Sequence, residues 1–451
     1  MTIRIVAILL ALAPAGAVSA EPLAEHVILI SIDGFRPDFD RDQTWPAPTL
    51  QYMKAKGAHA EGVLSVFPSV TYPAHTTIMT GVAPARHGIV YNNPFEPEGQ
   101  TGRWYWEANA IQAPTLWDVL QAEGRKTAAV SWPVTVGAPI DWAIPEVWDP
   151  SPSSEDRLKP MRDAARPAGL WNEIQLEATG NLNSRTYSGS YMSRDLETGA
   201  AAAHLFETQR PHFMALHLIG TDHFQHEEGR EGTKSKRALA VADAAISAIM
   251  EAVERAGALE TTTFVVTGDH GFVDTHTQLA PNVLLAEAGL TGTASDRGEW
   301  RASFHAMGGA AFLHLKDDSD TELVPKIHAM LEALDPKYRR LFTIVDRKAM
   351  DALGAAPEAR LGLAAELGVA FTADATGDLH RAGAGGTHGY LPDAFPEIHT
   401  GFVAWGAGIR EGITVHRMNL TDIAPLVGEL LNVPFETSEG ATPKGILISR
   451  K

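Results

Sequence analysis

The chain has 451 residues, of which 45% are hydrophobic, so it can bury a large core and is predicted to form one large domain with a smaller one inserted. Its 37 Lys and Arg against 55 Asp and Glu give a formal charge of −18, which argues against binding to nucleic-acid polymers or anionic membranes. The absence of cysteine excludes disulfide bonds and leaves histidine and carboxylate side chains to hold any transition metal.

Residues 1–20 have the pattern of a secretory signal peptide. Arg4 supplies the positive start, an apolar run follows, and Val18-Ser19-Ala20 is a small-residue cleavage pattern before Glu21. A membrane anchor or a buried N-terminal helix is the alternative, but the run is shorter than the roughly 20 residues a bilayer span needs. We therefore expect a periplasmic or secreted protein that is not membrane-bound once the signal is removed.

Apolar runs typical of buried parallel strands alternate with helix-like stretches along most of the chain. The runs are HVILISIDGF (26–35), KTAAVSW (126–132), PHFMALHLIG (211–220), TTTFVVTGDHGF (261–272) and HTGFVAWGAGI (399–409). Residues 237–257 have the apolar spacing of an amphipathic helix. The alternation predicts a layered α/β domain with a mostly parallel central sheet flanked by helices, whose chemistry gathers at the carboxyl ends of the strands.

The pattern changes between residues 308 and 374. Short strand-like segments such as GGAAFLHLK and LGVAFTA alternate there with ELVPKIHAMLEAL and with a Glu- and Leu-rich segment expected to be helical. This predicts a small α/β subdomain at 308–374, inserted into a core formed by residues 21–307 and 375–451.

The stretch FPSVTYPAHTTIMTG (67–81) places a hydroxyl group at the mouth of a helix. A strand-like run ends at Pro68 and a helix-like segment begins near Pro73, so Thr71 lies where free backbone N–H groups and the helix dipole favour an anion. The plainer alternative is that Thr71 only caps the helix.

Six side chains able to bind a metal stand in short polar motifs: Asp33, Asp222, His226, Asp269, His270 and His388. Asp222 and His226, four apart in TDHFQH, can share one face of a helix. Asp269 and His270 stand between glycines that let the backbone turn sharply. Three carboxylates and three imidazoles suit two zinc-like ions a few ångströms apart, which could lower the pKa of a threonine hydroxyl and make it a nucleophile.

The ordered set SIDGFRPD, FPSVTYPAHTTIMTG, HGIVYN, TDHFQH, GDHGF and GTHGY resembles the alkaline phosphatase superfamily, and within it the nucleotide pyrophosphatase/phosphodiesterase branch. The resemblance covers residues 26 to 430 approximately. It implies an alkaline-phosphatase-like core and an enzyme that cleaves phosphodiester or nucleotide pyrophosphate bonds in a small substrate through a phosphothreonine intermediate. It leaves the oligomeric state open.

The resemblance also implies a division of the ligands between two Zn²⁺ ions. One ion is implied to be held by Asp222, His226 and His388. The other is implied to be held by Asp33, Asp269 and His270, with Thr71 bridging toward it.

Two further residues acquire roles through the same resemblance. Asn92 matches the asparagine that hydrogen-bonds a non-bridging phosphoryl oxygen, and Tyr72 stands where the family often places an aromatic ring against the leaving group or base. The neighbouring Trp104, Tyr105 and Trp106 form either a base-stacking wall or ordinary packing.

The chain departs from the usual family pattern at Thr221, Gln225 and His217, where proline, glycine and tyrosine are frequent. These changes remove no ligand, but they alter the neighbouring pocket. Phosphonoacetate-hydrolase-like or phosphomonoesterase activity on the same scaffold therefore stays an alternative, as does a non-catalytic secreted binding protein. Sulfatases are disfavoured because no Cys or Ser stands in a C/S-x-P-S-R context. Cofactor-independent phosphoglycerate mutases are disfavoured because they use serine and this chain is expected to be exported.

Overall fold

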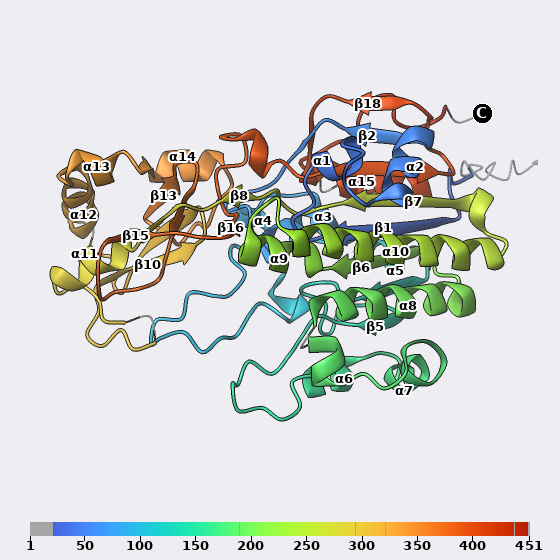
Figure 1. Cartoon of the computed structure of the whole chain (residues 1–451), viewed down its shortest axis with the longest axis horizontal. Helices are drawn as coiled ribbons and strands as arrows, with labels where there is room; N and C mark the ends of the chain where they lie inside the picture. The colour runs from blue at the N-terminus through green and yellow to red at the C-terminus, as the bar shows by residue number, and fades with distance from the viewer. Residues whose placement is uncertain (1–20, 189, 294, 321, 437, 450–451) are drawn as a thin grey trace, which may run out of the picture.

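The computed structural model describes residues 21–449 except residues 189, 294, 321 and 437, so the predicted signal peptide lies outside the described residues. Two parts lie side by side along the molecule, a large one built on an eight-stranded sheet and a smaller one built on a four-stranded sheet (Figure 1). Within the described residues, no helix has both the length and the apolar character that crossing a bilayer requires.

The central sheet is parallel except for one strand. Its order is β18-β2-β17-β7-β1-β6-β4-β5, and β17 runs opposite to both of its neighbours. The strands are β1 (His26–Ile32), β2 (Ala58–Ala60), β4 (Thr127–Val130), β5 (Trp142–Ile144), β6 (Phe213–Leu218), β7 (Thr262–Thr267), β17 (Phe402–Gly406) and β18 (Ile413–Val415). The predicted mostly parallel α/β fold is confirmed, and the late apolar run at 399–409 supplies the reversed strand.

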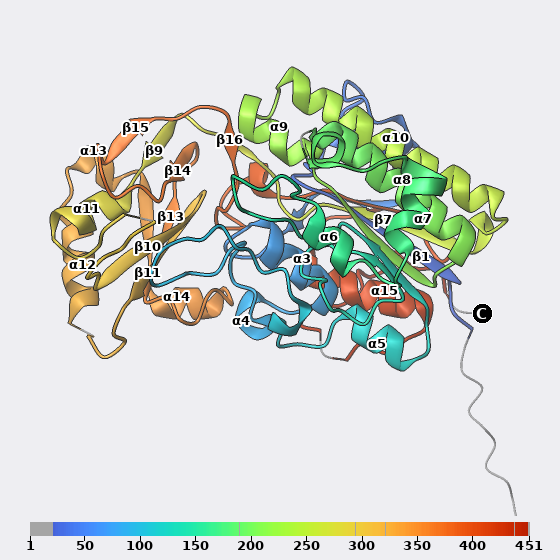
Figure 2. The ribbon, with the colours of Figure 1, turned by 90° about the horizontal axis from the view of Figure 1, so that it is seen from below.

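Helices cover both faces of this sheet (Figure 2). One face packs against α8 (Tyr191–Gln209) and α10 (Thr233–Arg255), and the other against α3 (Thr71–Thr80), α5 (Leu116–Ala122) and α15 (Ile423–Leu431). Residues Ile28 and Ile30 of β1 belong to the first apolar cluster, and Val27 and Leu29 belong to the second. Because both faces are covered, every residue of β1 is buried, which explains why the strand is largely apolar.

Short elements occupy the connections around the sheet. The helices are α1 (Asp38–Arg41), α2 (Pro48–Lys56), α4 (Pro84–His87), α6 (Lys159–Ala164), α7 (Leu170–Ile174) and α9 (Gly220–Glu228). The small sheets pair β3 (Val63–Leu64) with β19 (Met418–Asn419), β8 (Val273–Asp274) with β16 (Gly386–Thr387), and β9 (Thr277–Leu279) with β14 (Val369–Phe371) and β15 (His380–Ala382).

The smaller part contains an antiparallel sheet in the order β10-β11-β13-β12. Its elements are β10 (Ala302–Met307), β11 (Ala310–Leu315), β12 (Phe342–Val345), β13 (Leu361–Ala365), α11 (Pro281–Glu287), α12 (Leu323–Glu332), α13 (Pro336–Arg339) and α14 (Arg347–Ala352). The boundaries 308 and 374 stay a prediction, and the sheet includes β10, which precedes residue 308. The helix expected in the Glu- and Leu-rich segment is wrong beyond α14, because β13 pairs with strands on both sides and this pairing outweighs helix propensity.

Asp40 of α1 is a charged group buried without a hydrogen bond. Its side chain is fully buried, neither carboxylate oxygen has a hydrogen-bond partner, and Lys54 Nζ approaches only to 3.9 Å. Burial therefore raises the pKa of Asp40 from 3.8 to about 7, against a smaller lowering by Lys54.

Replacing Asp40 with asparagine is expected to stabilise the protein at alkaline pH. The raised pKa means that stability from this group is present below pH 3.8 and is lost as pH rises through about 7. The asparagine variant should be more stable by roughly 1–3 kcal/mol above that range, with a gap that closes toward acidic pH. Urea unfolding of both proteins across this range measures the gap, and a difference independent of pH would contradict the explanation.

Candidate active site

The candidate site lies at the carboxyl ends of three adjacent strands of the central sheet. Asp33 directly follows β1, Asp222 lies in the first turn of α9 after β6, and Asp269 follows β7. Parallel pairing places Ile32 of β1 opposite Leu218 of β6, so the strands end at one edge and deliver their carboxylates together.

Two groups of side chains are close enough to hold a metal ion. Asp33, Asp269 and His270 form one, and Asp222, His270 and His388 form the other, with the ligand atoms of each group within 4.8 Å of one another. His270 Nε2 lies 3.1 Å from Asp269 Oδ2 and 3.4 Å from Asp33 Oδ1. His270 therefore stands between two neighbouring sites.

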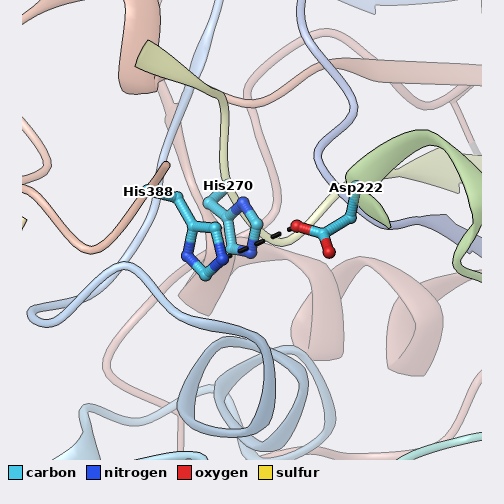
Figure 3. A group of neighbouring side chains, drawn as sticks. All are labelled: Asp222, His270 and His388. Atoms are coloured by element: carbon cyan, nitrogen blue, oxygen red, sulfur yellow. Dashed lines mark ion pairs between the residues drawn. The ribbon is translucent and has the colours of Figure 1, made fainter. Parts of the chain in front are cut away.

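Asp222 is the centre of the second group. Its Oδ1 lies 3.5 Å from His388 Nε2, as the dashed line in Figure 3 marks, and 3.4 Å from His226 Nε2. Figure 3 also shows the rings of His270 and His388 side by side, stacked with centroids 3.6 Å apart. The structure thus brings together all six residues that the sequence indicated as ligands. Among them, His226 lies close to the others by its contact with Asp222.

The three histidines are oriented in the same way. The Nδ1 atoms of His226, His270 and His388 lie 2.9, 3.1 and 3.0 Å from the backbone carbonyl oxygens of Gly386, Gly271 and Ser69, respectively. A proton on Nδ1 that donates to the carbonyl leaves the Nε2 lone pair facing the carboxylates. Metal-binding histidines are commonly fixed by a hydrogen bond of this kind.

Several ligand atoms are buried without a hydrogen bond. They are Asp33 Oδ1, Asp222 Oδ1, Asp269 Oδ2 and His270 Nε2. A buried polar atom left unpaired costs about 1–3 kcal/mol, and divalent cations placed among these atoms would satisfy all four. The nitrogen and oxygen donors, with no sulfur, fit Zn²⁺.

The charges at the site also favour bound cations. Burial, together with the charges of Asp269 and Asp222, raises the pKa of Asp33 well above its ordinary value. Burial also opposes the charge of Asp269, but the neighbouring His270 outweighs it and holds the pKa of that carboxyl low. Three carboxylates crowded in a buried space repel one another unless positive charge lies between them.

Thr71 is the first residue of α3, and only 7% of it is exposed. The N-cap position belongs to Val70, which has no hydroxyl, so the capping role considered for Thr71 does not apply. The carbonyl oxygen of Thr71 lies 2.8 Å from His75 Nδ1, which ties His75 to the helix. The side chain of Thr71 lines the same cavity as Asp33 and Asp222.

Asn92 lies beside the start of α3. Its Oδ1 accepts a hydrogen bond of 2.8 Å from the backbone N–H of Tyr72. This contact fixes the amide plane and leaves the NH₂ group as the end that can donate to a bound oxygen.

The role of Tyr72 as a substrate contact stays a prediction. The structure places its side chain in the core, fully buried, with the hydroxyl donating to Glu146 Oε1 at 3.2 Å. Trp104, which packs edge-on against Tyr72 with ring centroids 5.0 Å apart, is the neighbouring ring that lines the cavity. Of the three aromatics considered for a wall, Trp106 is buried and Tyr105 is half-buried.

The cavity beside Thr71 has a volume of about 220 Å³ and mixes rings with charged groups. Its other aromatic and cationic lining residues are Trp148, Tyr187, Tyr191, His217, His223, Arg157 and Arg194. Tyr191 and His223 stack with centroids 3.7 Å apart. Such a lining suits a substrate with both a flat ring and negative charge.

A buried chain of polar groups leads from the ligands into this cavity, and sequence reasoning missed most of it. His217 bridges Asp33 Oδ2 at 3.1 Å and Glu146 Oε2 at 2.9 Å, and Arg194 lies 3.3 Å from the same Glu146 oxygen. Burial lowers the pKa of His217, but Glu146 and Asp33 together outweigh this effect and raise the pKa to about 10. The only sequence signal was the histidine at 217, because Glu146 and Arg194 stand in no recognisable motif.

The other two departures from the family pattern support the turn that carries Asp33. Thr221 Oγ1 donates to the Asp33 carbonyl oxygen at 2.5 Å, and Gln225 Nε2 donates to the Gly34 carbonyl oxygen at 3.0 Å. Gly34 has φ +67°, a conformation that favours glycine. These two side chains therefore fix the position of Asp33, one of the predicted metal ligands.

Comparisons with known proteins agree with this geometry. The sequence profile of the family described as type I phosphodiesterase / nucleotide pyrophosphatase matches residues 27–391. The chain is 22% identical to human ectonucleotide pyrophosphatase/phosphodiesterase family member 5, covering 96% of this chain and 80% of that protein. It is 25% identical to the rat family member 3 over 55% of this chain, but spans only a quarter of that relative.

Solved structures share the fold. The human family member 5 structure has a TM-score of 0.68 at 20% identity, covering 94% of this chain and all of that one. The structure of an inactive threonine-to-alanine variant of the murine family member 5 in complex with AMP has a TM-score of 0.66 at 20% identity, covering 92% and 97%.

Proposed function

This chain is a member of the type I phosphodiesterase/nucleotide pyrophosphatase family, and from that premise we propose that it is an exported two-zinc hydrolase of nucleotide phosphodiester or pyrophosphate bonds, with Thr71 as its nucleophile. The observation that carries the proposal is the position of Thr71. It begins α3 and lines one cavity with Asp33 and Asp222, a carboxylate from each of the two metal-binding groups. The N-terminal pattern of residues 1–20 supports export.

The ligand residues fit two zinc ions. Asp33, Asp269 and His270 would hold one ion, because their ligand atoms lie within 4.8 Å of one another. Asp222, His226 and His388 would hold the other, because Asp222 Oδ1 lies 3.4 Å from His226 Nε2 and 3.5 Å from His388 Nε2. Bound zinc would supply a Lewis acid that lowers the pKa of a hydroxyl or a water and offsets negative charge on the leaving oxygen.

The remaining chemistry belongs to residues of the chain. Thr71 Oγ1 forms the new bond to phosphorus, its hydroxyl proton is released, and the bond to the leaving oxygen breaks. The Asn92 NH₂ group and the backbone N–H of Thr71 donate to the equatorial phosphoryl oxygens, whose negative charge the helix dipole also favours. Water then cleaves the phosphothreonine ester and regenerates Thr71.

The cavity supports a nucleotide as the substrate. Its rings can stack on a base, and Arg157 and Arg194 lie where further negative charge would be held. The murine relative solved in complex with AMP is consistent with this substrate class.

The test is a comparison of substrates on protein whose zinc has been counted. We expect about two zinc ions per chain and a kcat/KM for bis-p-nitrophenyl phosphate at least about tenfold above that for p-nitrophenyl phosphate, a difference of ~1.4 kcal/mol in transition-state binding. Chelation should remove both activities, and added zinc should restore them. The mass of the exported protein should correspond to a chain that begins near Glu21.

Each alternative has its own outcome. Two zinc ions with faster turnover of p-nitrophenyl phosphate or phosphonoacetate would move the substrate to monoesters or phosphonates. Protein without zinc or turnover would contradict the hydrolase and favour a binding protein. An intact N-terminus would contradict export.

A further inference from the structure

The segment Tyr91–Phe95, here called the Asn92 segment, runs between the two parts of the molecule. On the side of the central sheet, Asn92 Oδ1 accepts from the Tyr72 N–H next to Thr71. On the other side, the segment contacts β10 and β11 through the hydrogen bonds described next, and Phe95 also packs edge-on against Trp300 with ring centroids 5.6 Å apart. The proposed oxygen-binding amide is thus supported from two directions.

Two buried histidines of the smaller sheet hold the segment on either side of Asn92. His305 Nε2 lies 3.0 Å from the carbonyl oxygen of Asn93, and His314 Nε2 lies 3.0 Å from the hydroxyl oxygen of Tyr91. The ring of Phe95 stacks on His314 with centroids 4.1 Å apart and an interplanar angle of 5°. Tyr91, His305 and His314 are at most 5% exposed.

Strand alternation explains why both histidines face the segment. His305 pairs with Phe312, and Phe312 and His314 are two residues apart on β11, so all three lie on one face of the sheet. Ala311 and Leu313 point to the opposite face, where they join a separate apolar cluster with Leu363. The two faces can therefore be disturbed separately.

The residue type at 305 is not explained by packing. Burial lowers the pKa of His305 to about 4, so the ring is neutral and its Nε2–H donates to Asn93, while Nδ1 remains buried without a partner. An apolar ring would fill the space without this unpaired atom. What the histidine adds is one hydrogen bond, and that bond fixes the backbone next to Asn92.

We propose that His305 and His314 are positioning residues through which the smaller sheet holds the Asn92 amide at the distance from Thr71 that a transferring phosphoryl group requires. The inference rests on the role of Asn92 in the proposed function. It gives the smaller part of the molecule a task in the reaction beyond its contact with His388, whose carbonyl oxygen accepts a hydrogen bond of 2.7 Å from the Gly309 N–H in the turn between β10 and β11.

A double-mutant cycle tests the proposal, with bis-p-nitrophenyl phosphate as the substrate. Asn92→Ala is expected to lower kcat about 10²-fold, and His305→Phe about tenfold, with zinc content unchanged. In the Asn92→Ala background, His305→Phe should change kcat by less than about twofold, because it acts through the amide already removed. His305→Gln, whose side-chain NH₂ can replace the Nε2–H, should restore most of the rate.

The outcomes distinguish a failure of the positioning role of His305 from a failure of the role of Asn92 in the proposed function. If His305→Phe lowers kcat equally in both backgrounds, the positioning role is overturned. If Asn92→Ala alone leaves kcat unchanged, the role of Asn92 in the proposed function fails instead. Tyr91→Phe, which removes only the hydroxyl paired with His314, repeats the cycle should His305→Phe not fold. Leu363→Ala, on the opposite face, is the matched control and should lower stability without coupling to Asn92.

Discussion

Replacing Thr71 with alanine is expected to abolish turnover while zinc content stays unchanged. The substitution removes the proposed nucleophile, Oγ1, and leaves untouched the six side chains that form the metal-binding groups. Loss of a nucleophile costs on the order of 10⁴-fold or more in kcat. Alanine suits the first turn of a helix, so the fold should persist. The measurement is kcat on bis-p-nitrophenyl phosphate, with zinc counted on the same preparation.

A second threonine of the same helix gives the control. Thr80 is fully buried and donates from Oγ1 to the carbonyl oxygen of Thr76, so Thr80→Ala makes the same chemical change at the far end of α3. This variant should lose some stability and keep its kcat. A Thr71→Ala protein that retains more than about a tenth of the activity would rule out the covalent mechanism.

Replacing Asp269 with asparagine is expected to release one zinc ion and nearly all activity. The change keeps the size of a fully buried side chain but removes the charge that pairs with His270 at 3.1 Å. Zinc content should fall from about two to about one per chain, and kcat by on the order of 10³-fold. Metal analysis after dialysis, together with thermal unfolding with and without added zinc, measures both effects.

Asp243 offers a matched control for this experiment. It is 3% exposed and accepts backbone hydrogen bonds from Thr49 and Leu50, away from the site. Asp243→Asn should therefore lower stability but keep zinc and activity. If Asp269→Asn binds as much zinc as the unchanged protein, the assignment of Asp269 as a ligand is wrong.

The parts of the site that follow strands could be predicted from the sequence. Asp33 and Asp269 follow largely apolar runs, and parallel strands that are buried on both faces end at a common edge, so the residues that follow them meet. The start of α3 at Thr71 was also readable to within two residues, from the prolines around it.

The cavity wall could not be predicted in the same way. Glu146 and Arg194 are far apart in the chain, and only the packing of α8 against β4 and β6 brings them to His217. The direction of the Tyr72 side chain depends on how α3 rests on the sheet, which no local pattern records. At Leu361–Ala365, pairing with two neighbouring strands outweighs the local preference for helix.

The complete burial of α3 limits how this catalyst can be altered. All ten residues, Thr71–Thr80, are buried, so the helix that carries the nucleophile has no side on which a change of volume is free of consequence. A new substrate preference therefore cannot be obtained by reshaping that helix. It must come from the irregular segments around Trp104 and Trp148, which line the cavity and are only partly buried against the core. Side chains can therefore be changed at the entrance of the cavity, but not in the helix that carries Thr71.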